Sequence, residues 1–189
     1  DLESKEILKQ LSRSHRRLAE LKGVARTIPD ERILISTLTL QEAKDSSEVE
    51  DIVTTQDDLY KAGLDIKQSV MNASTKEVLA YREAIEKGFS LVRTNRLLTN
   101  KTIKQIQAIL ENNDAGFRTS TGTKLKRNDG EVVYIPPQDA EQIINLMENL
   151  EDFINNEEIC DLDPLIKMAI IHHQFESIHP FSDGNGRTG

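Results

Sequence analysis

Apolar residues recur every three or four positions along most of the chain, which is the spacing of helices that bury one face. The first such stretch covers residues 5–22, and Gly23 is its predicted end. The second opens at Pro29-Asp30 and runs to about Lys44. Its apolar segment, residues 33–40, could also form a strand by propensity, but the polar residues on both sides favour a helix.

Two capping boxes predict the starts of the next helices. Thr55–Asp58 opens a short helix that ends near Gly63, and Ser74–Glu77 opens a longer one. The longer helix is expected to run through Lys87 and to stop at Gly88. Neither a repeat nor a low-complexity linker separates these pieces, so the sequence marks a domain boundary only softly.

Three further helices follow from the same spacing, at residues 101–111, at residues 138–155 and from Asp163-Pro164 onwards. Proline is favoured in the first turn of a helix, which supports the last of these starts. This last helix is apolar on nearly all sides, so we expect it to be buried centrally. His172 and His173 on it are expected to be packing or network residues rather than ligands.

Residues 117–135 have a different pattern, with short β-prone runs on either side of Asn128-Asp-Gly130. Asp-Gly between such runs predicts a β-hairpin, and Pro136-Pro137 ends it. A lone hairpin is only marginally stable, so it must rest on the helical body. The sequence therefore predicts a mostly α fold with one hairpin, which by itself could be a purely structural ribbon.

Composition excludes several classes of function. The net charge of −8 argues against non-specific nucleic-acid binding, because no broad basic face can neutralise phosphates. No apolar run reaches membrane length, and no signal-peptide pattern opens the chain. The single cysteine, Cys160, suits a reducing compartment, so the cytoplasm is the expected location.

The last eleven residues, His179-Pro-Phe-Ser-Asp-Gly-Asn-Gly-Arg-Thr-Gly189, gather several reactive groups in one loop. Gly184 and Gly186 let backbone N–H groups turn towards an anion, and Arg187 adds a fixed positive charge. Asp183 would repel phosphates unless a divalent metal lies between them, an arrangement that Mg²⁺ accepts. His179 can take a proton from an attacking hydroxyl. The loop therefore predicts phosphoryl or nucleotidyl transfer.

Three other interpretations compete with this one. Gly184–Gly189 matches G-x-G-x-x-G, but a dinucleotide site needs a strand before that pattern and an acidic residue about 20 positions after it. His172, His173 and His179 could hold zinc, although neither an HExxH motif nor a cysteine pair supports them. The loop could also be a Gly/Asn turn whose histidine merely caps a helix.

The same loop resembles the signature of Fic-domain proteins, usually written HPFx(D/E)GNGRxxR. Every specified position matches up to Arg187. The family's second arginine would be the residue after Gly189, and two further helices would follow it. The resemblance therefore implies that residues 66–189 are a Fic domain that stops just after the signature loop. Residues 1–65 would be a helical N-terminal region.

By this resemblance the activity is protein adenylylation, in which AMP passes from ATP to a Ser, Thr or Tyr hydroxyl of a target protein, which could be the chain itself. His179 would be the general base and Asp183 the ligand of Mg²⁺. The hairpin would be a flap that aligns the target. A homo-oligomer is left open. The residues implied to bind ATP are Gly184, Asn185, Gly186, Arg187, Thr188 and Gly189.

The acidic stretch around residues 45–52 reads as a solvated helix face on its own. It also partly matches the motif (S/T)xxxE(G/N) of Fic proteins with an inhibitory helix, through Ser46 and Glu50. Asp51 stands where that motif has Gly or Asn, and Ser47 is a neighbouring alternative to Ser46. The resemblance implies that Glu50 pairs with the second arginine and blocks productive seating of ATP.

Two other classes of function stay open from the sequence. Fic relatives also transfer phosphate, UMP or phosphocholine, or remove AMP, although the intact loop favours AMP transfer. A catalytically silent regulatory or binding module is the second alternative.

Overall fold

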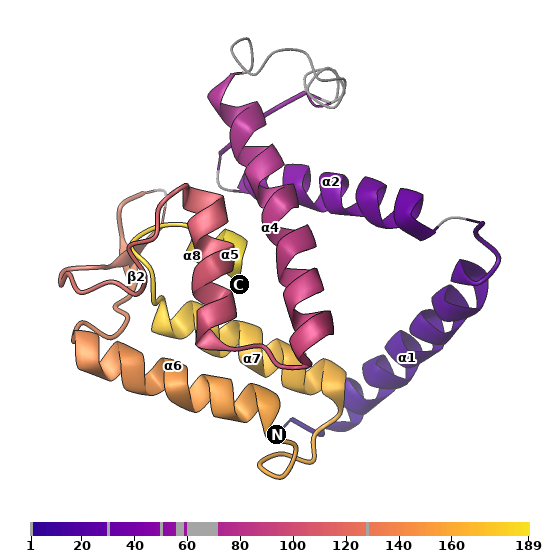
Figure 1. Cartoon of the computed structure of the whole chain (residues 1–189). Helices are drawn as coiled ribbons and strands as arrows, with labels where there is room; N and C mark the ends of the chain where they lie inside the picture. The colour runs from indigo at the N-terminus through magenta and orange to yellow at the C-terminus, as the bar shows by residue number, and fades with distance from the viewer. Residues whose placement is uncertain (1, 30, 50, 56–58, 60–71, 128) are drawn as a thin grey trace.

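A computed structural model describes the chain except for residues 1, 30, 50, 56–58, 60–71 and 128. It is mostly α-helical with one small antiparallel sheet, as the sequence predicts (Figure 1). The described elements are α1 Lys5–Ala25, α2 Glu31–Val49, α4 Ala73–Asn95, α5 Asn100–Glu111, β1 Leu125–Lys126, β2 Val132–Tyr134, α6 Ala140–Asn155, α7 Pro164–Ile178 and α8 Asn185–Thr188.

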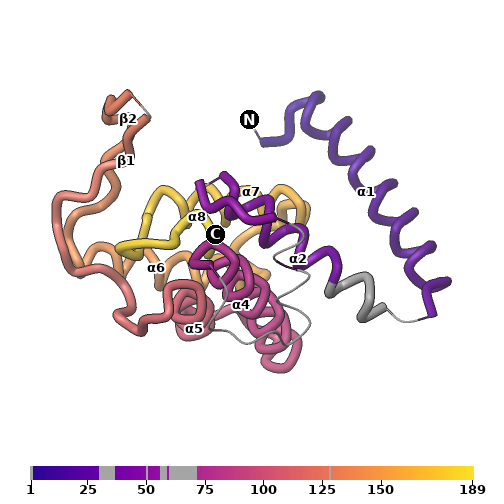
Figure 2. The backbone as a smooth tube through the Cα atoms, turned by 90° about the horizontal axis from the view of Figure 1, so that it is seen from above, coloured from indigo at the N-terminus to yellow at the C-terminus, as the bar shows by residue number. Residues whose placement is uncertain are grey.

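Helix α1 lies beside the helical body for most of its length rather than within it (Figures 1 and 2). None of its residues, all of which are described, is buried. A contact of 2.7 Å between the side chains of His15 and Asp163 ties it to the start of α7. The helix continues past Gly23, its predicted end, and is capped at Arg26.

Helices α2, α4 and α5 pack together around one core cluster. Its buried members are Ala43, Leu59, Val78, Tyr81, Ala84 and Leu110. Helix α4 does not stop at Gly88, as predicted, but runs to Asn95, with Arg96 as its left-handed C-cap. Gly88 is buried, and a Cβ there would meet Ile106 of α5, so its small size serves the close contact between the two helices.

Helices α5, α6 and α7 enclose the second core cluster, and Phe181 from the following loop completes it. The buried members are Ile103, Ile143, Met147, Leu150, Phe175, Ile178 and Phe181. Phe181 is fully buried, with its ring centroid 5.3 Å from that of Phe117 and 6.3 Å from that of Phe175. The loop after α7 is therefore anchored to the core by an aromatic side chain.

The prediction that α7 is buried centrally is wrong for most of the helix. Only Phe175 and Ile178 are buried, and Met168 is 61% exposed. Helix α6 packs along α7, whereas α1 touches it loosely and leaves grooves between the two helices. His172 and His173 lie on the exposed part and not in the core.

The predicted hairpin is present and projects from the body (Figure 2). Leu125 pairs with Tyr134 and Lys126 with Val132, with an irregularity in register between the two pairs. Gly130 in the turn has φ +88°, a conformation that favours glycine. The Tyr134 hydroxyl donates a hydrogen bond of 3.0 Å to a backbone carbonyl of α7.

Several predictions fall on residues that the structure does not describe. These are most of the short helix expected after Thr55, the domain boundary near residue 65, and Glu50. Within the described part of the chain, none of the helices has the length and apolar run that a membrane crossing requires.

Candidate functional site

The candidate site is the loop that links α7 to α8, and it begins at His179. His179 caps α7 in the left-handed conformation, with φ +51°, and its N–H donates to the Phe175 carbonyl over 2.9 Å. This cap ends the helix abruptly and turns the chain towards α5. A helix therefore precedes the glycine-rich stretch, which argues against a dinucleotide fold that needs a strand there.

Asn185 fixes the shape of the loop. Its side chain is buried, accepts a hydrogen bond from the Phe181 N–H over 2.9 Å and donates one to the Phe181 carbonyl over 2.8 Å. Both polar atoms of the amide are thus engaged inside the protein, which leaves the backbone N–H of Asn185 as its simplest contact for a ligand. These two bonds connect Asn185 to Phe181, the residue that anchors the loop to the core.

Gly184 occupies a position that favours glycine. Its φ is +73°, and a Cβ there would collide with the carboxylate of Glu111 from α5. Its carbonyl accepts hydrogen bonds from the Thr188 N–H (3.0 Å) and hydroxyl (2.7 Å). Gly186, by contrast, lies inside α8 and is exposed, so its contribution is open space rather than an unusual backbone angle.

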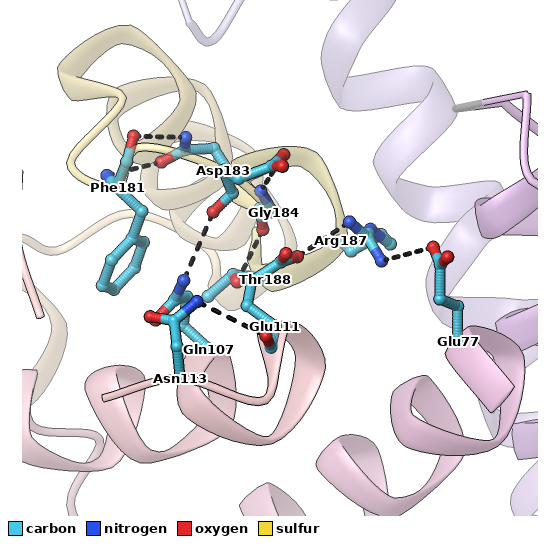
Figure 3. Close-up of polar contacts among 10 residues, drawn as sticks. Glu77, Gln107, Glu111, Asn113, Phe181, Asp183, Gly184, Arg187 and Thr188 are labelled. Atoms are coloured by element: carbon cyan, nitrogen blue, oxygen red, sulfur yellow. Dashed lines mark hydrogen bonds and ion pairs between the residues drawn. The ribbon is translucent and has the colours of Figure 1, made fainter. Parts of the chain in front are cut away.

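Arg187 is turned towards the protein (Figure 3). Its Nη2 donates to Oε1 of Glu111 over 2.7 Å, and its Nη1 lies 3.7 Å from Oε2 of Glu77 on α4. The arginine side chain is 6% exposed. The positive charge expected for phosphates is therefore already paired with two carboxylates in this structure.

Asp183 remains at the surface. Its Oδ1 accepts a hydrogen bond of 2.8 Å from the Gly184 N–H, and its backbone carbonyl accepts one of 3.4 Å from Gln107 (Figure 3). Within the described residues, no group of three His, Cys, Asp or Glu side chains could enclose a metal ion. A single exposed carboxylate nevertheless suits Mg²⁺, which commonly takes one or two protein carboxylates together with phosphate oxygens and water.

The imidazole of His179 is half-buried in a setting that favours its neutral form. Burial lowers its pKa below the ordinary value, and the positive charge of Arg118 lowers it further. A backbone contact at Glu176 and the charge of Asp183 act in the opposite direction. A histidine that is neutral near pH 7 can accept a proton, so this environment suits a general base.

Of the two residues predicted to inhibit, Ser46 and Glu50, the structure describes Ser46. It lies on α2, and its Oγ accepts a hydrogen bond of 3.2 Å from the Tyr81 hydroxyl of α4. Ser47, the alternative, is completely buried. Helix α4 in turn reaches the loop through the pair between Glu77 and Arg187.

Sequence reasoning missed four residues that shape the site, namely Glu77, Gln107, Glu111 and Arg118. Each lies far from the loop along the chain, on α4, on α5 or just before the hairpin. The sequence around Arg118 is mostly polar, so it holds no signal that this arginine is buried. Glu111 looks like any polar residue at a helix end, so the sequence alone gave no reason to place it beside Arg187.

Two sequence models of known families match this chain. The model described as Fic/DOC family N-terminal matches residues 8–90, and the model described as Fic/DOC family matches residues 97–189. The second match contains the whole candidate loop, and the first contains most of α1, all of α2 and most of α4.

Among curated proteins, the chain is similar to "Protein adenylyltransferase Fic" of Drosophila erecta, with 30% identity over 127 residues, or 65% of this chain. It is also similar to "Protein adenylyltransferase fic-1" of Caenorhabditis elegans, with 36% identity over 52 residues, or 28% of this chain. The chain spans 26% of the length of the first protein and 10% of the second.

Solved structures share the fold. A Fic family protein from Desulfovibrio desulfuricans aligns with a TM-score of 0.74 at 20% identity, covering 98% of this chain and 55% of that one. Fic-1 from Caenorhabditis elegans aligns with a TM-score of 0.69 at 18% identity, covering 98% and 56%. With the two sequence models and the signature loop held in the same helical frame, these similarities show that the chain belongs to the Fic/DOC family.

Proposed function

We propose that the chain acts as a protein adenylyltransferase, which transfers AMP from ATP to a Ser, Thr or Tyr hydroxyl of a protein. The observation that carries the proposal is that two groups lie on one glycine-rich loop, which the hydrogen bonds of Asn185 hold in shape. These groups are His179, a base with a lowered pKa, and Asp183, an exposed carboxylate. The names of the curated relatives support the same reaction.

In the proposed step, the target hydroxyl oxygen forms a bond to the α-phosphorus of ATP. The bond from that phosphorus to the bridging oxygen breaks, and pyrophosphate leaves. His179 takes the hydroxyl proton as the new bond forms, a contribution typically worth about 10²–10⁴ in rate. The lowered pKa keeps the imidazole ready for this role near neutral pH.

The ATP phosphates would lie against the start of α8. The N–H groups in the first turn of a helix have no carbonyl partner within the helix, so they can face an anion. Side chains offer less, since Asn185 and Thr188 bond within the loop and Arg187 could meet a phosphate only by sharing its pair with Glu111. The proposed ATP contacts are Gly184, Asn185, Gly186, Arg187, Thr188 and Gly189.

Asp183 would hold Mg²⁺ on those phosphates. The ion would neutralise phosphate charge as the α-phosphorus is attacked. Asp183 suits this task because its carboxylate is exposed while its Oδ1 is oriented by the Gly184 N–H. The same hydrogen bond holds the carboxylate beside the backbone of Gly184.

The target protein would be presented by the hairpin. Strand β2 exposes Val132, Val133 and Tyr134, and β1 and β2 form a sheet of two strands with open edges. An extended segment of a target can add to such an edge through main-chain hydrogen bonds. The target hydroxyl would then be delivered next to α7 and its cap, His179.

We further propose that Glu50, which follows α2 in the sequence, restrains the enzyme, with Ser46 helping to hold α2 in place. The support is the bond between Ser46 and Tyr81, which fastens the end of α2 to α4. A carboxylate can imitate a phosphate towards a guanidinium, so Glu50 would compete with the γ-phosphate for an arginine.

The reaction class is tested with ATP labelled on either the α- or the γ-phosphate. AMP transfer places only the α-label on protein, whereas phosphate transfer places only the γ-label. Incubation of the chain alone reveals auto-modification, and a mixture of candidate proteins reveals other targets. Protein without either label, under conditions where ATP binds, would indicate a silent regulatory module instead.

A further inference from the structure

Arg118 is a buried cation that the proposed chemistry does not use directly. It lies just before the hairpin and is 3% exposed. Its Nε donates to the His179 carbonyl over 2.8 Å, and its Nη2 lies 3.5 Å from the Ile178 carbonyl. Its backbone N–H donates to the Pro180 carbonyl over 2.8 Å. One residue therefore holds three successive carbonyls around the proposed base.

The same guanidinium also holds both ends of the hairpin. Nη1 donates to the Ser120 carbonyl over 3.4 Å, and Nη2 donates to the Pro137 carbonyl over 2.5 Å. These two residues flank β1 and β2 in the sequence. The end of α7 and the base of the hairpin are thus joined through a single side chain.

His179 needs such support because of its backbone conformation. A non-glycine residue at φ +51° is unfavourable by itself and persists when its surroundings hold it. The bond from its N–H to Phe175 fixes one side of the peptide, and Arg118 fixes the carbonyl on the other. The direction of the imidazole follows from this backbone.

The charge of Arg118 acts on the same imidazole. The charged groups that influence His179 are Arg118, from the segment before the hairpin, and Asp183, from the loop itself. Arg118 disfavours a second positive charge at His179, in the same direction as burial. Losing the arginine charge would therefore raise the pKa of His179.

We propose that Arg118 is a positioning residue. It fixes the base of the hairpin relative to the imidazole of His179, and so places the hydroxyl of a target bound at the hairpin next to that imidazole. The inference deepens the proposed function and rests on it. Its physical basis is that small misplacements of reacting groups cost large factors in rate. Arg118 does not touch the glycine loop from Asp183 onwards in any of its hydrogen bonds, so ATP binding should not depend on it.

The test compares Arg118→Lys and Arg118→Met with Arg17→Met. Lysine keeps the charge but presents its donors from a single nitrogen atom, whereas methionine removes both charge and donors. Arg17 is the matched control, because it lies on α1, outside the loop and the hairpin, and its exposed side chain pairs with Glu20 of the same helix. Each purified variant is measured for folding, ATP affinity and transfer rate.

The expected result is a kcat lower by about 10- to 100-fold for Arg118→Lys, with the KM for ATP within about twofold of the parent protein. Arg118→Met should lower kcat by at least the same factor. It should also raise the pKa of His179, which is measured by NMR titration. The chain has four histidines, so the His179 signal is identified by its loss in His179→Asn. Arg17→Met should match the parent in all measurements.

Each outcome decides the proposal. A folded Arg118→Lys with kcat within twofold of the parent overturns it, as does a loss of kcat that merely equals the unfolded fraction. If Arg118→Met does not fold, Arg118→Lys carries the decision. If the parent protein transfers no label, the proposed function fails. The NMR measurement still tests the contact with His179, and unchanged signals of residues 178–180 in Arg118→Lys would then overturn the positioning role.

Discussion

The guanidinium of Arg187 lies 2.7 Å from the carboxylate of Glu111, and this pair joins α8 to α5 beneath the glycine loop. The same carboxylate packs against Gly184, where a Cβ would collide with it. Glu111 therefore has two tasks, since it balances a buried charge and fills the space that the glycine leaves. The loop is supported by a charge pair whose carboxylate lies outside the motif.

The pair should contribute to stability. Glu111→Gln keeps the size of the side chain but removes its charge, so we expect the free energy of unfolding to fall by about 1.5–3 kcal/mol, the range for hydrogen bonds to charged groups. Glu77→Gln is the control, because Glu77 is 43% exposed and 3.7 Å from Arg187. Its effect should stay below about 1 kcal/mol. Equal losses in urea unfolding would contradict the unequal roles of the two carboxylates.

His179 should be needed for transfer and not for ATP binding. We expect His179→Asn to lower the transfer rate by about 10²–10⁴, because it removes the base. Asparagine is preferred over alanine here, since it tolerates the left-handed conformation of this position. His173→Asn, an exposed change on the same helix, is the control. Label transfer by His179→Asn at the rate of this control would remove His179 from the proposed mechanism.

The pH dependence should show the lowered pKa of His179. The neutral imidazole is the active form, so the rate should rise with pH, and the midpoint should lie below the ordinary histidine value of about 6.5. The unfolded chain binds the proton more tightly, so the free energy of unfolding should fall as the pH drops below about 6.5. A rate midpoint above that value would show that the charge of Asp183 outweighs burial and Arg118.

Asp183 can be tested without disturbing the loop. Asp183→Asn removes the charge but keeps an oxygen that can accept from the Gly184 N–H. We expect it to weaken ATP binding in the presence of Mg²⁺, whereas binding without metal should be unchanged or stronger because repulsion is relieved. Calorimetric titration with and without Mg²⁺ measures both. Equal losses in the two conditions would make Asp183 a structural residue of the turn.

Removal of Glu50 should activate the enzyme. Loss of a charge-assisted pair of about 1.5–3 kcal/mol would favour productive ATP seating by roughly ten- to a hundred-fold. The comparison uses a chain that continues past Gly189, where the family's second arginine is expected. Glu50→Gly should raise auto-modification there, and the added His179→Asn should abolish it.

The control for Glu50 is Glu48→Gly. Glu48 is exposed near the end of α2 and lies 3.5 Å from Lys44, so it is an acidic neighbour of Glu50 in the sequence without the proposed task. Activation by both changes would indicate a general loosening of α2. Unchanged activity in Glu50→Gly would show that Glu50 does not restrain the enzyme.

The sequence by itself determined those features that depend on neighbouring residues. The loop from His179 onwards could be read because its chemistry lies within eleven consecutive positions. Asp-Gly sets the hairpin turn through local backbone preference, and Asp163-Pro164 starts α7 for the same reason. Phe181 is an apolar residue in a polar loop, a pattern that favours burial, and it is fully buried.

Tertiary structure alone decided the features that depend on distant residues. Gly88 is an ordinary stop signal in the sequence, yet α5 packs against it and α4 continues. The limited burial of α7 is a second case, because its apolar sequence predicts a buried helix whereas only Phe175 and Ile178 are buried. Arg118 and Glu111 reach the loop across 61 and 76 positions of sequence, and their charges acquire a role only where the fold buries them beside His179 and Arg187.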